Sequence, residues 1–225
     1  MPGRYVQASA RRQHLSKALV FGGAFNPPTV AHVDLAEFAM KAAGFDYVIF
    51  VPTKNTYISD TQHKEYVFSD ASRVRMLEKI AETRPWMIVS RFELDARQQP
   101  RTYETLCHFR DQGYTCSLLF GSDKLPELEH GWKYVDSICR EFGIVCMSRK
   151  DDDTEAMLDR DPYLRSLRKY ILLLDTPPQT RNVSSTAVRM HLAEMKERFR
   201  QVKQILPEEL HTMILDYMCE SEGEE

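Results

Sequence analysis

The sequence has 225 residues, of which 43% are hydrophobic and 28% are charged. This length and apolar content are sufficient for one large α/β domain. A formal net charge of −3 argues against a nucleic-acid-binding protein, because such proteins carry a basic surface. No apolar run approaches the roughly 18 residues that a membrane-spanning helix needs, so no membrane partner is expected.

The two ends of the chain differ from its middle. Residues 1–15 are expected to form a flexible leader, because they are basic but lack the apolar core of a secretory signal. An organelle address is the alternative. Residues 219–225 are expected to form an acidic tail, which leaves residues 16–218 as the domain. Five cysteines without a Cys-x-x-Cys pair indicate a reducing, cytoplasmic compartment and no zinc site. Cys116 and Cys146 lie in apolar runs and are expected to be buried.

Six short apolar runs, rich in β-branched and aromatic residues, predict β-strands. They are nearly continuous rather than alternating, which is typical of parallel strands that are buried on both faces. The runs are Lys17–Phe21, Tyr47–Val51, Trp86–Ser90, Cys116–Phe120, Ile144–Met147 and Tyr170–Leu174.

Helical patterns separate these runs. Ser69 or Asp70 is the expected N-cap of the second helix, and Pro207 stands in the first turn of a final one. Apart from this final helix, the predicted helices are Ala31–Ala43, Ser69–Glu82, Tyr103–Arg110, Lys133–Glu141, Glu155–Leu167 and Ser185–Phe199. Repeated strand–helix–strand units predict a single-domain α/β fold with a Rossmann-like, doubly wound parallel sheet and C-terminal helices. Ligands bind such sheets at the carboxyl ends of the strands.

The segment Gly22–His32, which reads GGAFNPPTVAH, follows the first predicted strand. Two glycines at a strand end let a backbone approach a phosphate closely. Thr29 is a natural N-cap, so His32 is expected in the first helical turn, beside unpaired N–H groups that attract an anion. A glycine turn with a surface histidine is the alternative. The segment is neither a Walker A loop nor a dinucleotide-binding fingerprint.

A second helix start with the features of a phosphate site follows the last predicted strand. Ser184 and Ser185 are good caps, and exposed N–H groups at a helix start bind anions. Arg189 shares a helix face with Ser185 and Thr186. A cation in a first turn opposes the helix dipole, which an anionic partner would explain. An ordinary capped helix with a solvated arginine is the alternative.

Both segments resemble motifs of the nucleotidyltransferase superfamily that carries a His-x-Gly-His or Thr-x-x-His signature. The resemblance is closest to the nicotinate and nicotinamide mononucleotide adenylyltransferases and covers roughly Leu15 to Leu210. Thr29 stands where many bacterial members have the first histidine, and Ala31 where they have glycine. Two further segments are similar to the family, namely 70–77 and 102–106.

The resemblance and the residues together imply an ATP site with little covalent chemistry from the protein. His32 and Arg189 are the candidate catalytic residues. The ATP-binding residues would be Gly22, Gly23, Ala24, Phe25, Asn26, Thr29, His32, Ser184, Ser185, Thr186 and Arg189. Mg²⁺ is expected to arrive with ATP, without a dedicated protein site.

A mononucleotide is expected beside the ATP. Lys54 follows the second strand closely and is the candidate cation for its phosphate. Asp123 follows the fourth strand, where its carboxylate could accept hydrogen bonds from ribose hydroxyls. Trp132 could stack on a pyridine ring, although core packing would also explain a tryptophan there. Thr102 and Tyr103 close the pyridine pocket by resemblance.

The sequence therefore predicts an adenylyltransferase of NAD biosynthesis that joins a pyridine mononucleotide to ATP and releases pyrophosphate. Nicotinate mononucleotide is the favoured substrate and nicotinamide mononucleotide the second. A phosphopantetheine adenylyltransferase, a CDP-forming cytidylyltransferase and a non-catalytic nucleotide-binding module are the alternatives. The oligomeric state is not readable from the sequence.

Overall fold

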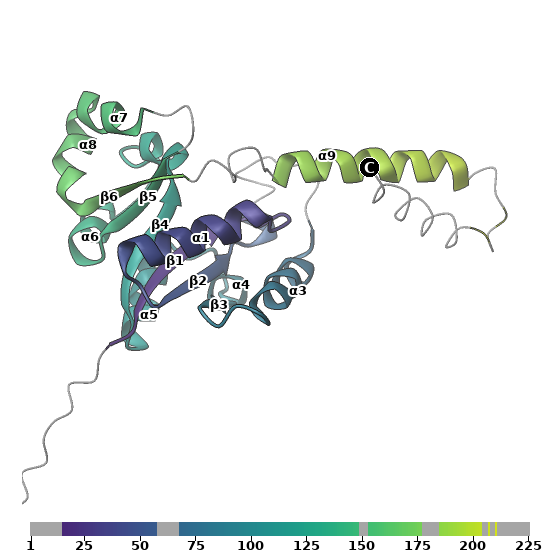
Figure 1. Ribbon diagram of the computed structural model, residues 1–225, viewed down its shortest axis with the longest axis horizontal. Helices are drawn as coiled ribbons and strands as arrows, with labels where there is room; N and C mark the ends of the chain where they lie inside the picture. The colour runs from purple at the N-terminus through teal and green to yellow at the C-terminus, as the bar shows by residue number, and fades with distance from the viewer. Residues whose placement is uncertain are drawn as a thin grey trace, which may run out of the picture.

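The computed structural model describes residues 15–57, 68–148, 153–176, 185–203, 207 and 210. Within these ranges, six strands form one parallel sheet in the order β3-β2-β1-β4-β5-β6 (Figure 1). This arrangement confirms the predicted doubly wound sheet. The strands are β1 (Lys17–Gly23), β2 (Tyr47–Pro52), β3 (Met87–Val89), β4 (Thr115–Gly121), β5 (Ile144–Ser148) and β6 (Ile171–Asp175).

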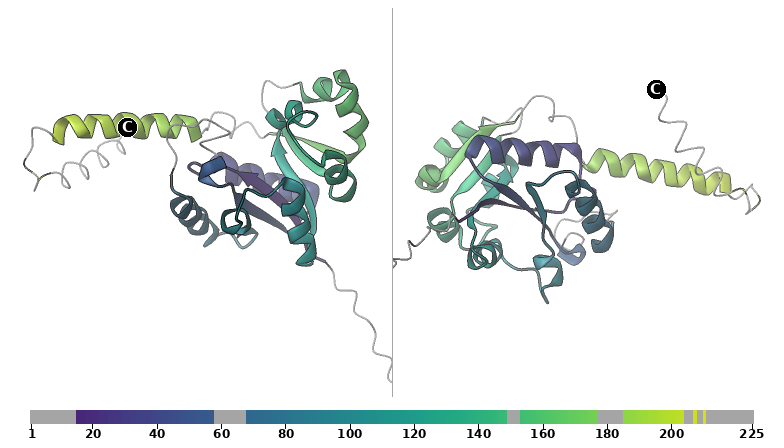
Figure 2. Two further views of the ribbon diagram at one scale, coloured as in Figure 1. Left: turned by 180° about the vertical axis from the view of Figure 1, so that it is seen from behind. Right: turned by 60° about the horizontal axis from the view of Figure 1, so that its bottom comes forward.

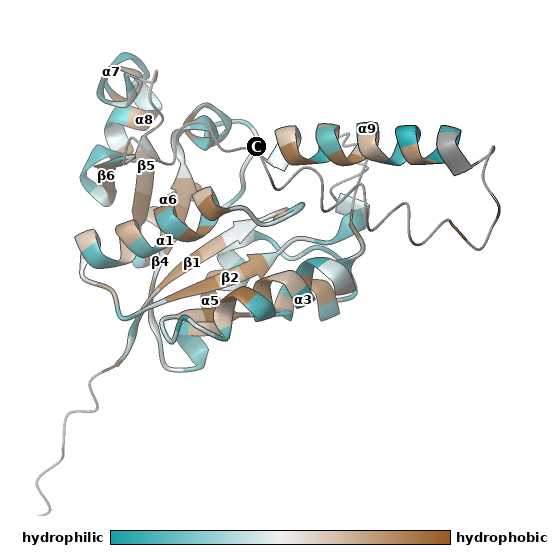
Figure 3. Ribbon diagram, turned by 45° about the vertical axis from the view of Figure 1, so that its right-hand side comes forward, coloured by the Kyte–Doolittle hydropathy of each residue, from teal (hydrophilic) through white to brown (hydrophobic). Residues whose placement is uncertain are grey.

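Successive residues of the central strand β1 point to opposite faces of the sheet. Ala18 and Val20 belong to one hydrophobic cluster, and Leu19 between them belongs to the other. All three are at most 1% exposed. A strand that is buried on both sides has to be apolar at every position, which explains the continuous apolar runs in the sequence. Figure 3 shows the same effect as strands coloured brown, for hydrophobic, along the centre of the sheet.

One face of the sheet is covered by α1 (Val30–Ala43) and α3 (Asp70–Ala81). These helices contribute Ala36, Ala39 and Leu77 to the cluster on that side. The opposite face is covered by α5 (Thr102–Asp111), α6 (Val135–Glu141), α7 (Thr154–Arg160) and α8 (Pro162–Leu167). Their buried side chains include Leu106, Phe109, Ile138, Leu158 and Leu164. The core therefore consists of two apolar layers, one on each side of the sheet.

The predicted helix Glu155–Leu167 is wrong as a single element. The structure divides it into α7 and α8 at Asp161, whose backbone is extended, with φ −89° and ψ 118°. The Asp161 side chain accepts hydrogen bonds from the main-chain N–H groups of Tyr163 (2.8 Å) and Leu164 (3.1 Å). Pro162 then occupies the first position of α8. A capping aspartate followed by proline starts a new helix, and this local signal prevails over the apolar periodicity.

Three short elements lie in segments where no helix was predicted. They are α4 (Phe92–Asp95) and the 3₁₀ helices η1 (Ser122–Glu127) and η2 (Arg168–Tyr170). A single turn of helix has too few residues for an apolar periodicity to be recognised. The leader, the acidic tail and nearly all of the helix predicted after Pro207 lie outside the described residues.

α9 (Ser185–Lys203) extends away from the sheet, and its first turn lies near the start of α1 (Figures 1 and 2). None of the helices in the described ranges is long and apolar enough to cross a membrane.

Cys116, Cys139 and Cys146 are buried among apolar side chains, as expected for the first and the last of them. Burial raises the pKa of the Cys116 thiol to about 12 and that of the Cys139 thiol to about 11. Both thiols are therefore protonated at neutral pH and pack as small apolar groups.

Replacing the cap of α8 tests the break between α7 and α8. Asp161→Ala removes the acceptor for two main-chain N–H groups, so it should lower the free energy of unfolding by about 0.5–2 kcal/mol. Urea unfolding followed by circular dichroism measures this change. Asp159→Ala, at an exposed position two residues earlier, is the matched control and should change the stability by less than about 0.5 kcal/mol. Equal effects of the two substitutions would contradict the capping role.

Candidate active site

The order of the strands reverses between β1 and β4. The chain leaves β1 toward α1 and β2 on one side, whereas the strands after β4 lie on the other side. In open parallel sheets this reversal opens a crevice at the carboxyl ends of the two strands. The predicted phosphate loop follows β1 and Asp123 follows β4, so both lie at this crevice.

Gly22 and Gly23 lie within β1, opposite Val51 and Pro52 of β2. The strand therefore continues two residues beyond its predicted end. A Cβ on Gly23 would lie 3.2 Å from the tip of the Phe25 ring, whereas a Cβ on Gly22 would meet nothing within 4 Å. Packing within the chain thus explains Gly23, and the space beside Gly22 is open to a ligand.

The turn after β1 is formed at Phe25, which has a positive φ of 43°. Non-glycine residues rarely adopt this conformation, and where they do, the surroundings hold them in it. The Phe25 ring is 1% exposed and makes edge contacts with the rings of Phe21 and His32, at centroid distances of 5.3 Å each. The Phe25 ring belongs to a buried hydrophobic cluster and thus holds the turn against the core.

Thr29 is the N-cap of α1, and His32 lies in its first turn, as predicted. The Thr29 main-chain N–H donates to His32 Nδ1 (3.1 Å), and Thr29 Oγ1 lies 2.8 Å from the same nitrogen. A main-chain N–H can only donate, so Nδ1 acts as the acceptor and the proton of the neutral imidazole is at Nε2. Thr29 therefore sets the tautomer and the orientation of His32.

The first turn of α9 contacts the loop after β1 directly. Ser185 Oγ donates to the Pro27 carbonyl (2.8 Å), and Arg189 Nη1 donates to the Asn26 carbonyl (2.8 Å). Arg189 Nη2 also bonds Thr186 Oγ1 (3.0 Å). The two predicted phosphate segments, about 160 residues apart in sequence, are thus joined at the same end of the sheet.

Asn26 and Ser184 are also predicted to bind ATP at this point. Asn26 is 1% exposed, and its Oδ1 accepts a hydrogen bond from the Phe68 main-chain N–H (2.8 Å). Its carbonyl and side-chain oxygens therefore both hold other segments of the chain. Ser184 lies outside the described residues.

Lys54 follows β2 by two residues, and its ammonium group donates to the Leu94 carbonyl (2.5 Å). Its main-chain N–H donates to Gln99 Oε1 (3.0 Å). Lys54 thus bonds the α4–α5 region in this structure. A phosphate contact from Lys54 stays a prediction that requires its side chain to exchange this carbonyl for a ligand.

Asp123 lies in η1, directly after β4, with its carboxylate 42% exposed and 3.9 Å from the Lys124 ammonium. Trp132 is half-buried, and its ring meets that of Phe120 at a centroid distance of 5.9 Å and an angle of 62°. Trp132 therefore packs partly against the core cluster.

Thr102 is the first residue of α5, and Tyr103 follows it. The Tyr103 hydroxyl lies 3.0 Å from the Glu141 carboxylate, at the end of α6. The Tyr103 ring is thus directed between α5 and α6. A contact of Tyr103 with a ligand stays a prediction.

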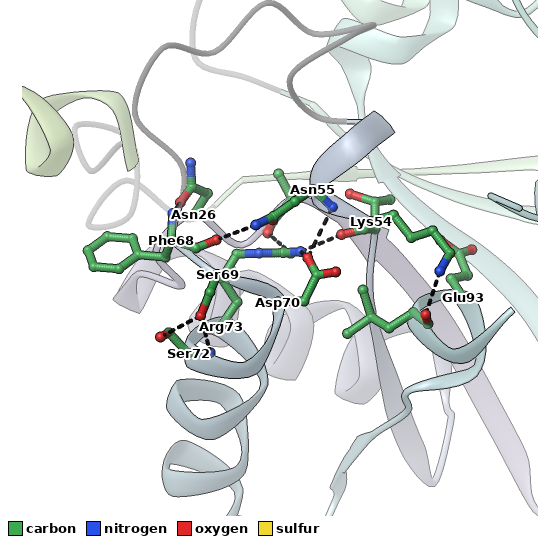
Figure 4. A network of polar contacts seen from close by, with 12 residues as sticks. Asn26, Lys54, Asn55, Phe68, Ser69, Asp70, Ser72, Arg73 and Glu93 are labelled. Carbon is green, nitrogen blue, oxygen red and sulfur yellow. Dashed lines mark hydrogen bonds and ion pairs between the residues drawn. The ribbon is translucent and has the colours of Figure 1, made fainter. Parts of the chain in front are cut away.

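Sequence reasoning missed Arg73 and Asp70 as members of the site. Arg73 has a fully buried side chain and bonds Asp70 Oδ1 at 2.6 Å (Figure 4). Asp70 Oδ1 also accepts a hydrogen bond from the Asn55 main-chain N–H (3.0 Å). Arg73 lies on the same face of α3 as the core residue Leu77. An arginine at an apolar position of the helix was the signal that could have identified it.

Glu93 on α4 is a second buried charge that sequence reasoning did not select. It is 6% exposed and accepts hydrogen bonds from Thr105 Oγ1 (2.8 Å) and Gln99 Nε2. Burial raises the pKa of the Glu93 carboxyl group, and these two hydrogen bonds oppose the rise. Glu93 thereby links the start of α5 to Gln99, and through Gln99 to Lys54.

In the described ranges no group of three or more His, Cys, Asp or Glu side chains could hold a metal ion. The donors gathered after β1 are main-chain N–H groups, an imidazole and a guanidinium, which suit an anion.

A family model described as cytidylyltransferase-like matches residues 20–191. The chain belongs to this family. The matched range begins in β1 and ends in α9, so this cytidylyltransferase-like region contains both phosphate segments. The expectation of a nucleotidyltransferase enzyme is confirmed.

Two curated relatives align over most of the chain, and both carry the name probable nicotinate-nucleotide adenylyltransferase. The Clostridium tetani protein is 29% identical over 206 residues, which are 90% of this chain and 98% of that protein. The protein of Clostridium botulinum strain Okra is 30% identical over 207 residues, which are 89% of this chain and 96% of that protein.

The fold is shared with a solved structure of a Plasmodium falciparum nicotinic acid mononucleotide adenylyltransferase complexed with APC. The TM-score is 0.60 at 17% identity, and the superposition covers 78% of this chain and 83% of that chain. The same enzyme complexed with NaAD gives a TM-score of 0.59.

The pH dependence of stability tests the buried Glu93. Its pKa in the folded protein is raised above 4.5, so its contribution to stability is fully present below pH 4.5 and is lost as the pH rises through the folded pKa. Glu93→Gln does not titrate. Urea unfolding between pH 4 and pH 8 should show the stability of this variant rising relative to that of the wild type as the pH increases.

Glu78→Gln, at an exposed position on α3, is the control and should follow the wild type across the same pH range. A difference between Glu93→Gln and wild type that does not change with pH would exclude a raised pKa at Glu93.

Proposed function

We propose that the chain is a nicotinate mononucleotide adenylyltransferase, which joins this mononucleotide to ATP and releases pyrophosphate. The observation that carries the proposal is the joining of the two phosphate segments, through Ser185 and Arg189, beside an imidazole whose tautomer is set by Thr29. The names of the two curated relatives support nicotinate as the substrate.

In the proposed reaction an oxygen of the mononucleotide 5′-phosphate attacks the α-phosphorus of ATP. A new P–O bond forms, and the bond between the α-phosphorus and its bridging oxygen to the β-phosphate breaks. Pyrophosphate leaves with the bonding electron pair. The protein contributes mainly orientation and stabilisation of charge, because phosphoryl-type transfer needs little covalent participation.

His32 would donate its Nε2 proton in a hydrogen bond to a phosphate oxygen as negative charge develops there. Since Nδ1 accepts from Thr29, the imidazole can fill this role while neutral, at any pH at which it is unprotonated. The adjacent start of α1 offers further N–H donors for the phosphates.

Arg189 and the first turn of α9 would bind the β- and γ-phosphates. The Arg189 guanidinium has five N–H donors, of which two are bonded to Asn26 and Thr186. Mg²⁺ would be held mainly by phosphate oxygens of ATP and would neutralise part of their charge. The mononucleotide would occupy the β4 side of the crevice, with Asp123 on its ribose and Trp132 beside its ring.

A panel of substrates tests the proposal. ATP or CTP is combined with nicotinate mononucleotide, nicotinamide mononucleotide, phosphopantetheine or glycerol phosphate, and pyrophosphate release is measured. ATP with nicotinate mononucleotide should give the highest kcat/KM. A preference for phosphopantetheine, or for CTP with glycerol phosphate, would identify another transferase of the family. Nucleotide binding without release from any pair would identify a non-catalytic module.

Removing the imidazole tests the chemical role of His32. His32→Ala should lower kcat by about 10²–10³-fold, the usual loss for one donor to a developing charge. Steady-state pyrophosphate release measures the change, with circular dichroism to confirm folding. His130→Ala, whose imidazole is 84% exposed, is the control and should keep wild-type kcat. A folded His32→Ala enzyme with kcat within threefold of wild type would refute the assignment.

The orienting role of Thr29 predicts a smaller loss of kcat for Thr29→Val than for His32→Ala. Thr29→Val removes Oγ1 but keeps the main-chain N–H that bonds Nδ1. Losing one of two hydrogen bonds to the ring should lower kcat by about 3- to 10-fold, since a neutral hydrogen bond contributes roughly 1 kcal/mol. A loss as large as that of His32→Ala would instead indicate direct contact between Thr29 and the phosphates.

A further inference from the structure

Arg73 holds two main-chain carbonyl groups from beneath the crevice. Its side chain is 0% exposed. Nη1 donates to the Ala24 carbonyl (2.5 Å) and Nη2 donates to the Thr53 carbonyl (2.5 Å). Figure 4 shows the guanidinium extended along this network, next to Asp70. One side chain from α3 therefore bonds the segments that follow β1 and β2.

Stability alone does not explain a cation at this position. Taking a guanidinium out of water is costly, and an apolar residue of similar volume is often at least as stabilising. Asp70 compensates only part of this cost, and within the described ranges Arg73 Nε has no hydrogen-bond partner. The position of the two carbonyl groups is what Arg73 provides and an apolar side chain would not.

The first of these carbonyl groups controls the direction of a neighbouring donor. In a planar trans peptide the C=O and N–H bonds point in opposite directions. Because Arg73 fixes the Ala24 oxygen, the N–H of Phe25 is fixed on the opposite side of that peptide. In the part of the chain that the structure describes, this N–H bonds no acceptor, and Arg73 is the sole hydrogen-bond partner of the Ala24 oxygen.

Phe25 itself opposes any rotation of this peptide. Its φ of 43° is maintained by a ring that is 1% exposed and lies against Gly23. The Ala24–Phe25 peptide is thus held on one side by a buried ring and on the other by a buried guanidinium. A cation on the carbonyl oxygen also polarises the peptide and makes its N–H a stronger donor.

We propose that Arg73 is a positioning residue for the triphosphate, acting through the Ala24–Phe25 peptide, whose N–H it aims and polarises toward a phosphate oxygen. This inference rests on the proposed use of ATP. It assigns to α3 a part in ATP binding that is exerted through the main chain of the loop after β1.

The second carbonyl group, that of Thr53, indicates which substrate should bind more weakly when Arg73 is replaced. The Thr53–Lys54 peptide has additional support, since its Lys54 N–H donates to Gln99 Oε1 (3.0 Å), and the N–H of the preceding peptide, at Thr53, donates to the Gly23 carbonyl (3.0 Å). Loss of Arg73 should therefore disturb the ATP side of the site more than the mononucleotide side.

The first test compares Arg73→Lys with Arg75→Lys, a control at an exposed position two residues along α3. A lysine cannot bond both carbonyl groups in the fork geometry of a guanidinium. Isothermal titration calorimetry without the second substrate should show ATP binding weakened on the order of 10- to 100-fold in Arg73→Lys. Nicotinate mononucleotide binding should change by less than about threefold, and Arg75→Lys should match the wild type. A folded Arg73→Lys protein with unchanged ATP affinity, or with equal losses for both substrates, would overturn the inference.

The second test does not depend on the stability of a variant. In wild-type protein with ¹⁵N-labelled phenylalanine, saturation with ATP should shift the amide resonance of Phe25 strongly. An unchanged Phe25 resonance at saturating ATP would overturn the inference. If the wild type binds ATP with this shift but releases no pyrophosphate with any mononucleotide, the proposed reaction fails while the role of Arg73 in phosphate binding stands.

Discussion

β1 is the strand on which the remainder of the structure depends, because it forms parallel ladders with both β2 and β4. Its central residues Ala18, Leu19 and Val20 are buried on both faces, so neither face can accept a polar side chain there. The chain leaves it toward one half of the sheet and returns to build the other half. The crevice therefore has to open at the carboxyl end of β1, where the strand stops being apolar and the phosphate segment begins.

The groups around this crevice are held by hydrogen bonds that run from α9 across the β1 loop to α3. Most of these bonds involve main-chain groups, so they fix the path of the backbone rather than one side chain. The residues in this chain of contacts are Arg189, Asn26, Phe68, Asn55, Asp70, Arg73 and Ala24. Fixing donors before the substrate arrives would avoid reorganisation during the reaction. The free energy needed to bury the charge of Arg73 is a cost of this prior arrangement.

Thr29 stands where many bacterial members of the adenylyltransferase family have the first motif histidine, and its contacts with His32 are compatible with the same reaction. A threonine is too short and uncharged to replace a histidine at a phosphate. It is nevertheless the right length to cap α1 and to contact His32 Nδ1 from the residue that also supplies the main-chain N–H. In the proposed reaction the chemical role would fall to His32 alone, with Thr29 defining which nitrogen carries its proton.

The sequence by itself determined the six strands and most helices, and it predicted the two phosphate segments, because these depend on periodicity, caps and residue types that are close together along the chain. It also indicated Thr29 and His32 as neighbours on one helical turn. Only the tertiary structure decided that Ser185 and Arg189 bond the loop before α1, that Tyr103 is directed toward Glu141, and that Lys54 bonds the Leu94 carbonyl. It alone revealed Glu93, and it alone showed which backbone groups surround Arg73, since the partners of a buried charge come from segments that are distant in sequence.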